Sequence, residues 1–208
     1  MALHKCTQKQ LPVTVVGAGL PQLVGQAGRA KSYAERLFEY PEIGPLAEAA
    51  AKQALVLPAE KLNVKYEQNA LNEILEQTKG YPYFLQEWGK HSWQYSVSSP
   101  ITIDDVKSAS VLALSELDAS FFRVRFDRLT PSEKKYLRAM AELGPGSHRS
   151  GDIAQLLKKG VQGVAPTRSS LINKGMIYSP DHGDNYFTVP LFDGYMKRIM
   201  PELGADRI

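Results

Sequence analysis

The stretch TPSEKKYLRAMAELG, residues 130–144, carries the signals that decide the fold of this chain. Thr130 is a typical N-cap residue, and Pro131 suits the first position of a helix. Glu133 stands where a capping box needs an acid, and Gly144 follows the last periodic apolar residue. All of these boundary signals agree, so the stretch predicts one helix that begins after Thr130 and ends before Gly144.

The residues after this helix predict two further helices and a hairpin. SGDIAQLLKKG (150–160) and VAPTRSSLINKG (164–175) each place apolar residues on one face of a short helix. Two short strands, 176–179 and 186–189, flank the turn-forming residues 180–185. Three helices followed by a β-hairpin is the order of elements in a winged-helix domain.

The N-terminal segment has a different pattern. LPVTVVGAGLP (11–21) predicts a buried strand at Val13–Val16 that ends in a glycine turn, followed by a helix and a second strand at 37–40. In an open α/β sheet such a strand needs parallel neighbours. We therefore expect residues 1–45 to be a remnant of an α/β core.

The middle of the chain is helical by pattern. Apolar residues between 70 and 75 fall on one face of a helix that ends at Gly80, and Thr102 with Asp105 predicts a capping box that opens another helix. Near 119–128 the helical periodicity breaks and the charge changes sign. We divide the chain into an α/β remnant (1–45), a helical bundle (46–120) and a winged helix (121–208). The expected fold class is mainly α with a small α/β remnant.

Composition sets broad limits on function. The 208 residues include a single cysteine, Cys6, and the sequence has neither an apolar run of membrane length nor the apolar core of a signal peptide. We expect a cytoplasmic protein with no membrane contact. Residues 1–120 carry 11 Lys and Arg against 13 Asp and Glu, whereas residues 121–208 carry 14 against 9. The basic C-terminal part favours an anionic partner such as DNA.

No catalytic or metal site is predicted. A P-loop needs G-x-x-x-x-G-K-[ST], but Gly89-Lys90 is followed by His91, and the turn Gly17-Ala-Gly19 has Gln22 where a dinucleotide fingerprint needs glycine. The four histidines show no metal-ligand spacing, and no serine has a base that the sequence identifies.

The order of these parts resembles the C-terminal half of AAA+ ATPases of the signal-transduction (STAND) group. The resemblance covers essentially the whole chain, and GYPYFLQ (80–86) is its most specific piece because it resembles the Gly-x-Pro motif of the helical lid. It implies a truncated core that keeps the sensor-1 strand and the last strand, a lid and a winged helix. Both Walker motifs are absent, so no autonomous ATP hydrolysis is expected and no cofactor is expected for this chain.

In the complete family, ATP and Mg²⁺ bind at the core, so the resemblance implies that Gly80, Tyr81, Pro82 and Arg36 lie near the nucleotide. An alternative from the residues alone is helix punctuation, in which Gly80 ends one helix and Pro82 begins the next. The function implied is a regulatory module that transmits nucleotide state to DNA or to a protein. The alternative is a stand-alone winged-helix DNA-binding regulator whose N-terminal region mediates oligomerisation.

The winged helix supplies the candidate DNA contacts. On this interpretation helix 164–175 enters the major groove, and the turn near His182 approaches the DNA backbone. The candidates, chosen for charge or hydrogen-bonding capacity, are Arg149, Lys158, Lys159, Thr167, Arg168, Ser169, Lys174 and His182. A protein partner, or a second copy bound through residues 1–45, is the alternative to DNA.

Overall fold

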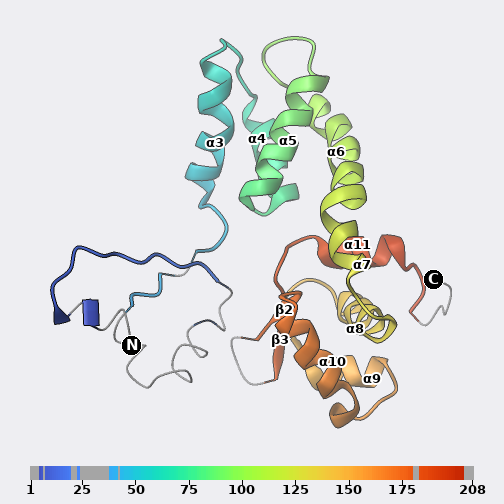
Figure 1. The fold of residues 1–208 in the computed structure, drawn as a ribbon. Helices are drawn as coiled ribbons and strands as arrows, with labels where there is room; N and C mark the ends of the chain where they lie inside the picture. Colours follow the sequence, from blue (N-terminus) through green and yellow to red (C-terminus); the bar gives the residue numbers. More distant parts are fainter. Residues whose placement is uncertain are drawn as a thin grey trace.

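The computed structural model describes residues 5–6, 8–19, 23, 38–41, 43–179 and 183–203. Helices dominate this part of the chain, and a small three-stranded sheet lies in its C-terminal region. The mainly α fold class with a small β component is therefore confirmed. Figure 1 shows a bundle of helices joined through α6 to a second group of elements that contains the sheet.

The first group is a four-helix bundle. Its buried faces pack around Ile74, Phe84 and Trp88, each at most 1% exposed. Trp88 also donates its indole N–H to Ser110 Oγ at 2.8 Å, which satisfies the polar atom of this large side chain. The helices predicted here are confirmed, including the Thr102–Asp105 capping box. Their bounds are α3 Glu48–Glu60, α4 Gln68–Thr78, α5 Pro82–Tyr95 and α6 Ile103–Leu117.

The boundary predicted near 119–128 is helical in the structure. After α6 the chain forms one π-helical segment, η2 (Asp118–Phe122), and then α7 (Arg123–Asp127), without leaving the helix. A π segment holds an extra residue in its turn, so it shifts the phase of the apolar pattern. The π segment accounts for the broken periodicity, and the domain boundary predicted near 119–128 stays a prediction.

The second group has the elements of a winged helix. Thr130 and Glu133 make the predicted capping box, and Pro131 is the first residue of the first helix. The strands form one antiparallel sheet in the order β1-β3-β2, with His148 opposite Asn185 and Ile177 opposite Phe187. The elements are α8 Pro131–Glu142, β1 His148–Arg149, α9 Ser150–Leu156, α10 Val161–Asn173, β2 Ile177–Tyr178, β3 Asp184–Phe187 and α11 Phe192–Ile199.

Some bounds differ from the predicted ones. The third helix begins at Val161, three residues earlier than predicted, and Pro166 lies inside it. Proline removes one helical hydrogen bond, and the carbonyl it leaves free belongs to the exposed residue Gln162, where water can replace the bond. β3 also begins two residues before the predicted strand. β1 and α11 were not predicted, because each is too short to show a period.

The strands predicted at the N-terminus are not formed in the described residues. Residues 13–16 and 38–40 have no strand conformation, and the side chains of Val13 and Val16 are 55% and 92% exposed. A strand needs hydrogen-bonded neighbours, and no described segment pairs with these residues. The predicted helix between these segments, together with Arg36, lies outside the described residues.

The helices were compared in length and apolar character with those that cross a membrane. In the part of the chain that the structure describes, none combines the length and the apolar character that a bilayer span requires.

Candidate nucleic-acid interface

Helix α10 occupies the position of a recognition helix and has two distinct faces. Its inner face buries Val164 and Leu171 against the domain core. Its outer face carries no charged side chain before Lys174, and consists of Val161, Gln162, Gly163, Ala165, Pro166, Ser169 and Asn173. The exposed surface of α10 can therefore offer amide, hydroxyl and small apolar groups, but no cation from within the helix.

Arg168 points into the domain. Its Nε donates to Asn185 Oδ1 at 2.6 Å, and its Nη2 donates to Ser179 Oγ at 2.7 Å and to the carbonyl of Asp184 at 3.3 Å. These contacts join α10 to the segment after β2 and to β3. Because the guanidinium is engaged inside the domain, we no longer assign Arg168 to a DNA phosphate.

Lys174 is also engaged. Its Nζ donates to Glu133 Oε2 at 2.7 Å and to the carbonyl of Arg128 at 2.9 Å. This connects the end of α10 with the start of α8, and it leaves little of the charge for an external anion. The side chain is still 35% exposed, so contact between Lys174 and DNA stays a prediction.

Glu133 is the centre of this contact. Burial raises its pKa, but hydrogen bonds from Lys174, from the Thr130 backbone and from Ser170 outweigh that effect, so the pKa falls to about 2. The carboxylate is 2% exposed yet fully ionised at neutral pH. It accepts hydrogen bonds from the N-cap residue of α8, from Ser170 of α10 and from Lys174, the C-cap residue of α10, and so fixes the angle between these helices.

Three of the predicted cations remain available. Arg149 precedes α9, whereas Lys158 and Lys159 follow it in the turn that leads to α10, and all three are exposed. Within the described residues none of them makes an ion pair or a side-chain hydrogen bond. Thr167 is half-buried, and His182 lies outside the described residues. The free positive charge of this surface is therefore placed at the two ends of α9.

Gly80, Tyr81 and Pro82 form the joint between α4 and α5. Gly80 has φ of +70°, Tyr81 is the N-cap residue of α5 and Pro82 is its first residue. A Cβ at Gly80 would lie 2.7 Å from the carbonyl oxygen of Leu46. The backbone N–H of Leu46 in turn donates a hydrogen bond to the carbonyl of Gly80 at 2.9 Å. Helix punctuation and close packing account for all three residues. Their place beside a nucleotide stays a prediction.

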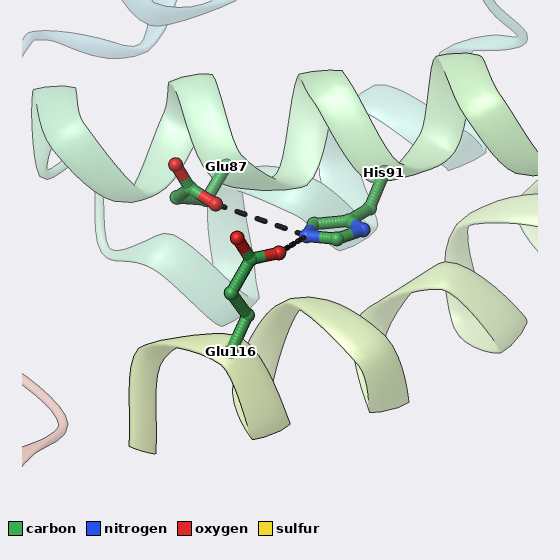
Figure 2. Close-up of side chains that lie close together, drawn as sticks. All are labelled: Glu87, His91 and Glu116. Carbon is green, nitrogen blue, oxygen red and sulfur yellow. Dashed lines mark ion pairs between the residues drawn. The ribbon is translucent and has the colours of Figure 1, made fainter. Parts of the chain in front are cut away.

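The structure also brings together three side chains that the sequence analysis did not connect. Glu87 and His91 lie four residues apart on α5, and Glu116 faces them from α6 (Figure 2). Each of the three residues offers one potential ligand atom, and these three atoms all lie within 4.8 Å of one another. The spacing of Glu87 and His91 is visible in the sequence, but the third residue is 25 positions away and only the packing of α5 on α6 reveals it.

Comparison with known proteins finds two similarities. A family described as a domain of unknown function, DUF8462, matches residues 119–196, which contain most of the winged helix. A Methanocaldococcus jannaschii protein described as an uncharacterized HTH-type transcriptional regulator is 28% identical over 122 residues. That alignment covers 59% of this chain and 29% of the relative, so the chain spans less than a third of the relative's length.

Proposed function

We propose that this chain is a DNA-binding regulatory module whose winged helix lies against duplex DNA. The observation that carries the proposal is the exposed, uncharged face of α10 next to free cations at both ends of α9. The relative described as a helix-turn-helix regulator supports it. The proposal favours the stand-alone regulator over a nucleotide-signalling role.

The two helices suit different parts of the duplex. In helix-turn-helix docking the second helix enters the major groove, while the helix before it crosses the phosphate backbone. Gln162 and Ser169 of α10 can hydrogen-bond base edges, and the methyl group of Ala165 can contact thymine. Arg149, Lys158 and Lys159 can bind phosphates on either side. Phosphate contacts would position the domain, and α10 would supply the sequence preference.

The number of free cations limits the expected affinity. Only three lie at α9, and Asp152 in the first turn of that helix offsets one of them. Binding should therefore weaken steeply as salt rises, because most of the favourable free energy would come from counterion release. An oligomer that presents two winged helices to one duplex would bind more tightly through avidity.

The test is the affinity of the full chain for a fluorescently labelled duplex, measured by anisotropy over a range of salt concentrations. The triple variant Arg149→Gln, Lys158→Gln, Lys159→Gln should bind at least about 10-fold more weakly at low salt. The slope of its plot of log K against log salt concentration should be smaller in magnitude by about 2 to 3, because each lost phosphate contact reduces that slope by about 0.9.

A matched control removes the same charge from the helical bundle. Lys61, Lys65 and Lys107 are exposed and belong to that region, so their triple change to Gln should leave the affinity within about twofold of the parent. Equal losses in the two triple variants would contradict this placement of the interface. If the parent chain binds no DNA at low salt, the proposal is overturned and the protein-binding alternative is left.

A second measurement separates base contacts from phosphate contacts. Gln162→Ala should change the preference among duplex sequences by about 1 to 3 kcal/mol and leave the salt slope unchanged. Selection of bound sequences from a random duplex pool, with the parent and with this variant, provides the readout.

A further inference from the structure

The group formed by Glu87, His91 and Glu116 has the donor set of a transition-metal site. It combines one imidazole nitrogen with two carboxylate oxygens, which are ligands that zinc and its neighbours in the first row accept. Figure 2 shows the ring nitrogen of His91 directed at both carboxylates, one on its own helix and one on α6. The ligands therefore come from two helices of the bundle.

The distances fit a small ion. His91 Nε2 lies 2.8 Å from Glu116 Oε2 and 3.7 Å from Glu87 Oε2. In a tetrahedral zinc site with bonds of about 2.0 to 2.1 Å, neighbouring ligand atoms stand about 3.3 Å apart. The two separations from His91 Nε2 lie about half an ångström on either side of that value, and all three pairs of potential ligand atoms lie within 4.8 Å.

Burial gives an independent indication of a missing ligand. The His91 side chain is 9% exposed, and its Nε2 meets Glu116 Oε2 at 2.8 Å as an ion pair that lacks hydrogen-bond geometry. Glu87 Oε2 is likewise buried without a hydrogen bond. Buried polar atoms are normally satisfied, because leaving one unpaired costs roughly 1 to 3 kcal/mol. A metal ion between these atoms would satisfy both at once.

Lys90 is the competitor for this position. Its Nζ donates to both oxygens of Glu116, at 3.0 and 3.1 Å, and lies 3.5 Å from Glu87 Oε2. The ammonium neutralises the carboxylates in the absence of a metal. Because the Lys90 side chain is 43% exposed, it can swing into solvent when an ion binds.

We propose that Glu87, His91 and Glu116 bind a divalent transition-metal ion, of which Zn²⁺ is the best match, with water in the remaining position. The ion would tie α5 to α6 at Glu116, two residues before the π segment η2 begins. The site would stabilise the bundle and its connection to the winged helix. This proposal does not depend on DNA binding.

The experiment is calorimetric titration of the full chain with Zn²⁺, after removal of metal by a chelator, together with thermal unfolding. One equivalent should bind and raise the unfolding temperature. His91→Gln and Glu116→Gln should each weaken binding by at least about 10-fold. Glu116 is half-exposed, so its variant tests the site without disturbing the core.

Two further variants make the result specific. Glu73→Gln removes a carboxylate from the surface of α4, outside the group, and should leave Zn²⁺ affinity unchanged. Lys90→Met removes the competing ammonium and should tighten binding severalfold. With Co²⁺ in place of Zn²⁺, the visible absorption of a four-coordinate ion should appear in the parent and disappear in His91→Gln.

The overturning outcomes are equally distinct. No binding of Zn²⁺ by the parent chain would reject the site and leave an ion-pair network. Binding that survives both His91→Gln and Glu116→Gln would place the ion elsewhere in the chain. Weaker binding in Lys90→Met would reject the role of this lysine as a competitor.

Discussion

The helical bundle and the winged helix differ in how strongly buried charged groups join their elements. In the bundle, the buried hydroxyl of Thr78 donates to the carbonyl of Ile74 within its own helix, and Trp88 and His91 each make one polar contact from α5 to α6. In the winged helix, buried Glu133, Arg138 and Asn185 all bond to other elements. Arg138, for example, donates from Nε to the Met200 carbonyl at 2.6 Å, which attaches α8 to the end of α11.

This difference follows from the length of the elements. The bundle helices have 11 to 15 residues and bury continuous apolar faces, whereas the winged helix contains strands of two to four residues and a seven-residue helix. Short elements bury too little apolar surface to fix their own positions, so charged cross-links contribute more. As a result, cations such as Arg138 and Arg168 hold the elements of the winged helix together and are not free to bind a ligand.

The two regions nevertheless share one core, and Phe122 joins them. Its ring is fully buried, 5.8 Å from the ring of Phe84 in the bundle and 5.2 Å from that of Tyr195 in α11. Bidentate contacts of 2.7 Å between Arg198 and Asp118 lie on the surface of the same junction. This predicts that the regions unfold together.

The largest expected effect comes from breaking that junction. Phe122→Ala should lower the free energy of unfolding by about 3 to 5 kcal/mol, because it leaves a cavity that both regions line. Both tryptophans belong to α5, so their fluorescence reports the bundle, while far-ultraviolet circular dichroism reports both regions. The two urea transitions should shift together.

Val124→Ala is the control for this experiment. Val124 is adjacent to the junction but 53% exposed, so the change should cost under about 1 kcal/mol. If Phe122→Ala shifts only one of the two transitions, the bundle and the winged helix have separate cores.

Next in size is the loss of the buried carboxylate in the winged helix. Glu133→Gln should destabilise the protein by about 2 to 3 kcal/mol, because the hydrogen bonds that Lys174, Ser170 and the Thr130 N–H donate to a buried carboxylate would lose their charged acceptor. Glu76→Gln, an exposed change in the bundle, should have almost no effect. A separation of the dichroism transition from the fluorescence transition in Glu133→Gln alone would show that the winged helix can unfold first.

The same carboxylate predicts a pH dependence. Its pKa is about 2 in the folded protein against 4.5 when unperturbed, so its stabilisation is complete above pH 4.5 and is lost as the pH falls toward 2. We expect a loss of about 2 kcal/mol between pH 6 and pH 3 from this group. Urea unfolding at each pH would show the difference between the parent and Glu133→Gln shrinking by that amount. A constant difference would contradict this assignment.

The smallest predicted effect compares the two capping boxes. Thr102→Ala and Thr130→Ala each remove a side chain that caps a helix, at a typical cost of about 1 kcal/mol. Thr130→Ala should cost more, because its partner Glu133 is buried whereas Asp105 is half-buried. Chemical denaturation of the two variants side by side measures the ranking, and equal costs would show that burial of the partner does not matter.

Local signals were sufficient for much of the fold. The capping boxes at Thr102 and Thr130, the glycine at position 80 and the proline at position 82 all stand where the sequence predicted them, because caps and punctuation depend on residues within one turn. The order of three helices and a hairpin in the winged helix is confirmed for the same reason. The free cations at Arg149, Lys158 and Lys159 were also among the predicted site residues.

Tertiary structure alone decided the rest. The valine-rich segment Val13–Val16 does not form a strand, because the hydrogen bonds of a strand must be completed by another segment. Arg168 and Lys174 have partners 11 to 46 positions away, and Glu116 meets His91 across two helices. The sequence determined which residues could be charged, capped or helical. Packing determined which charges remained free, because a short-range contact between distant residues leaves no period or motif in the chain.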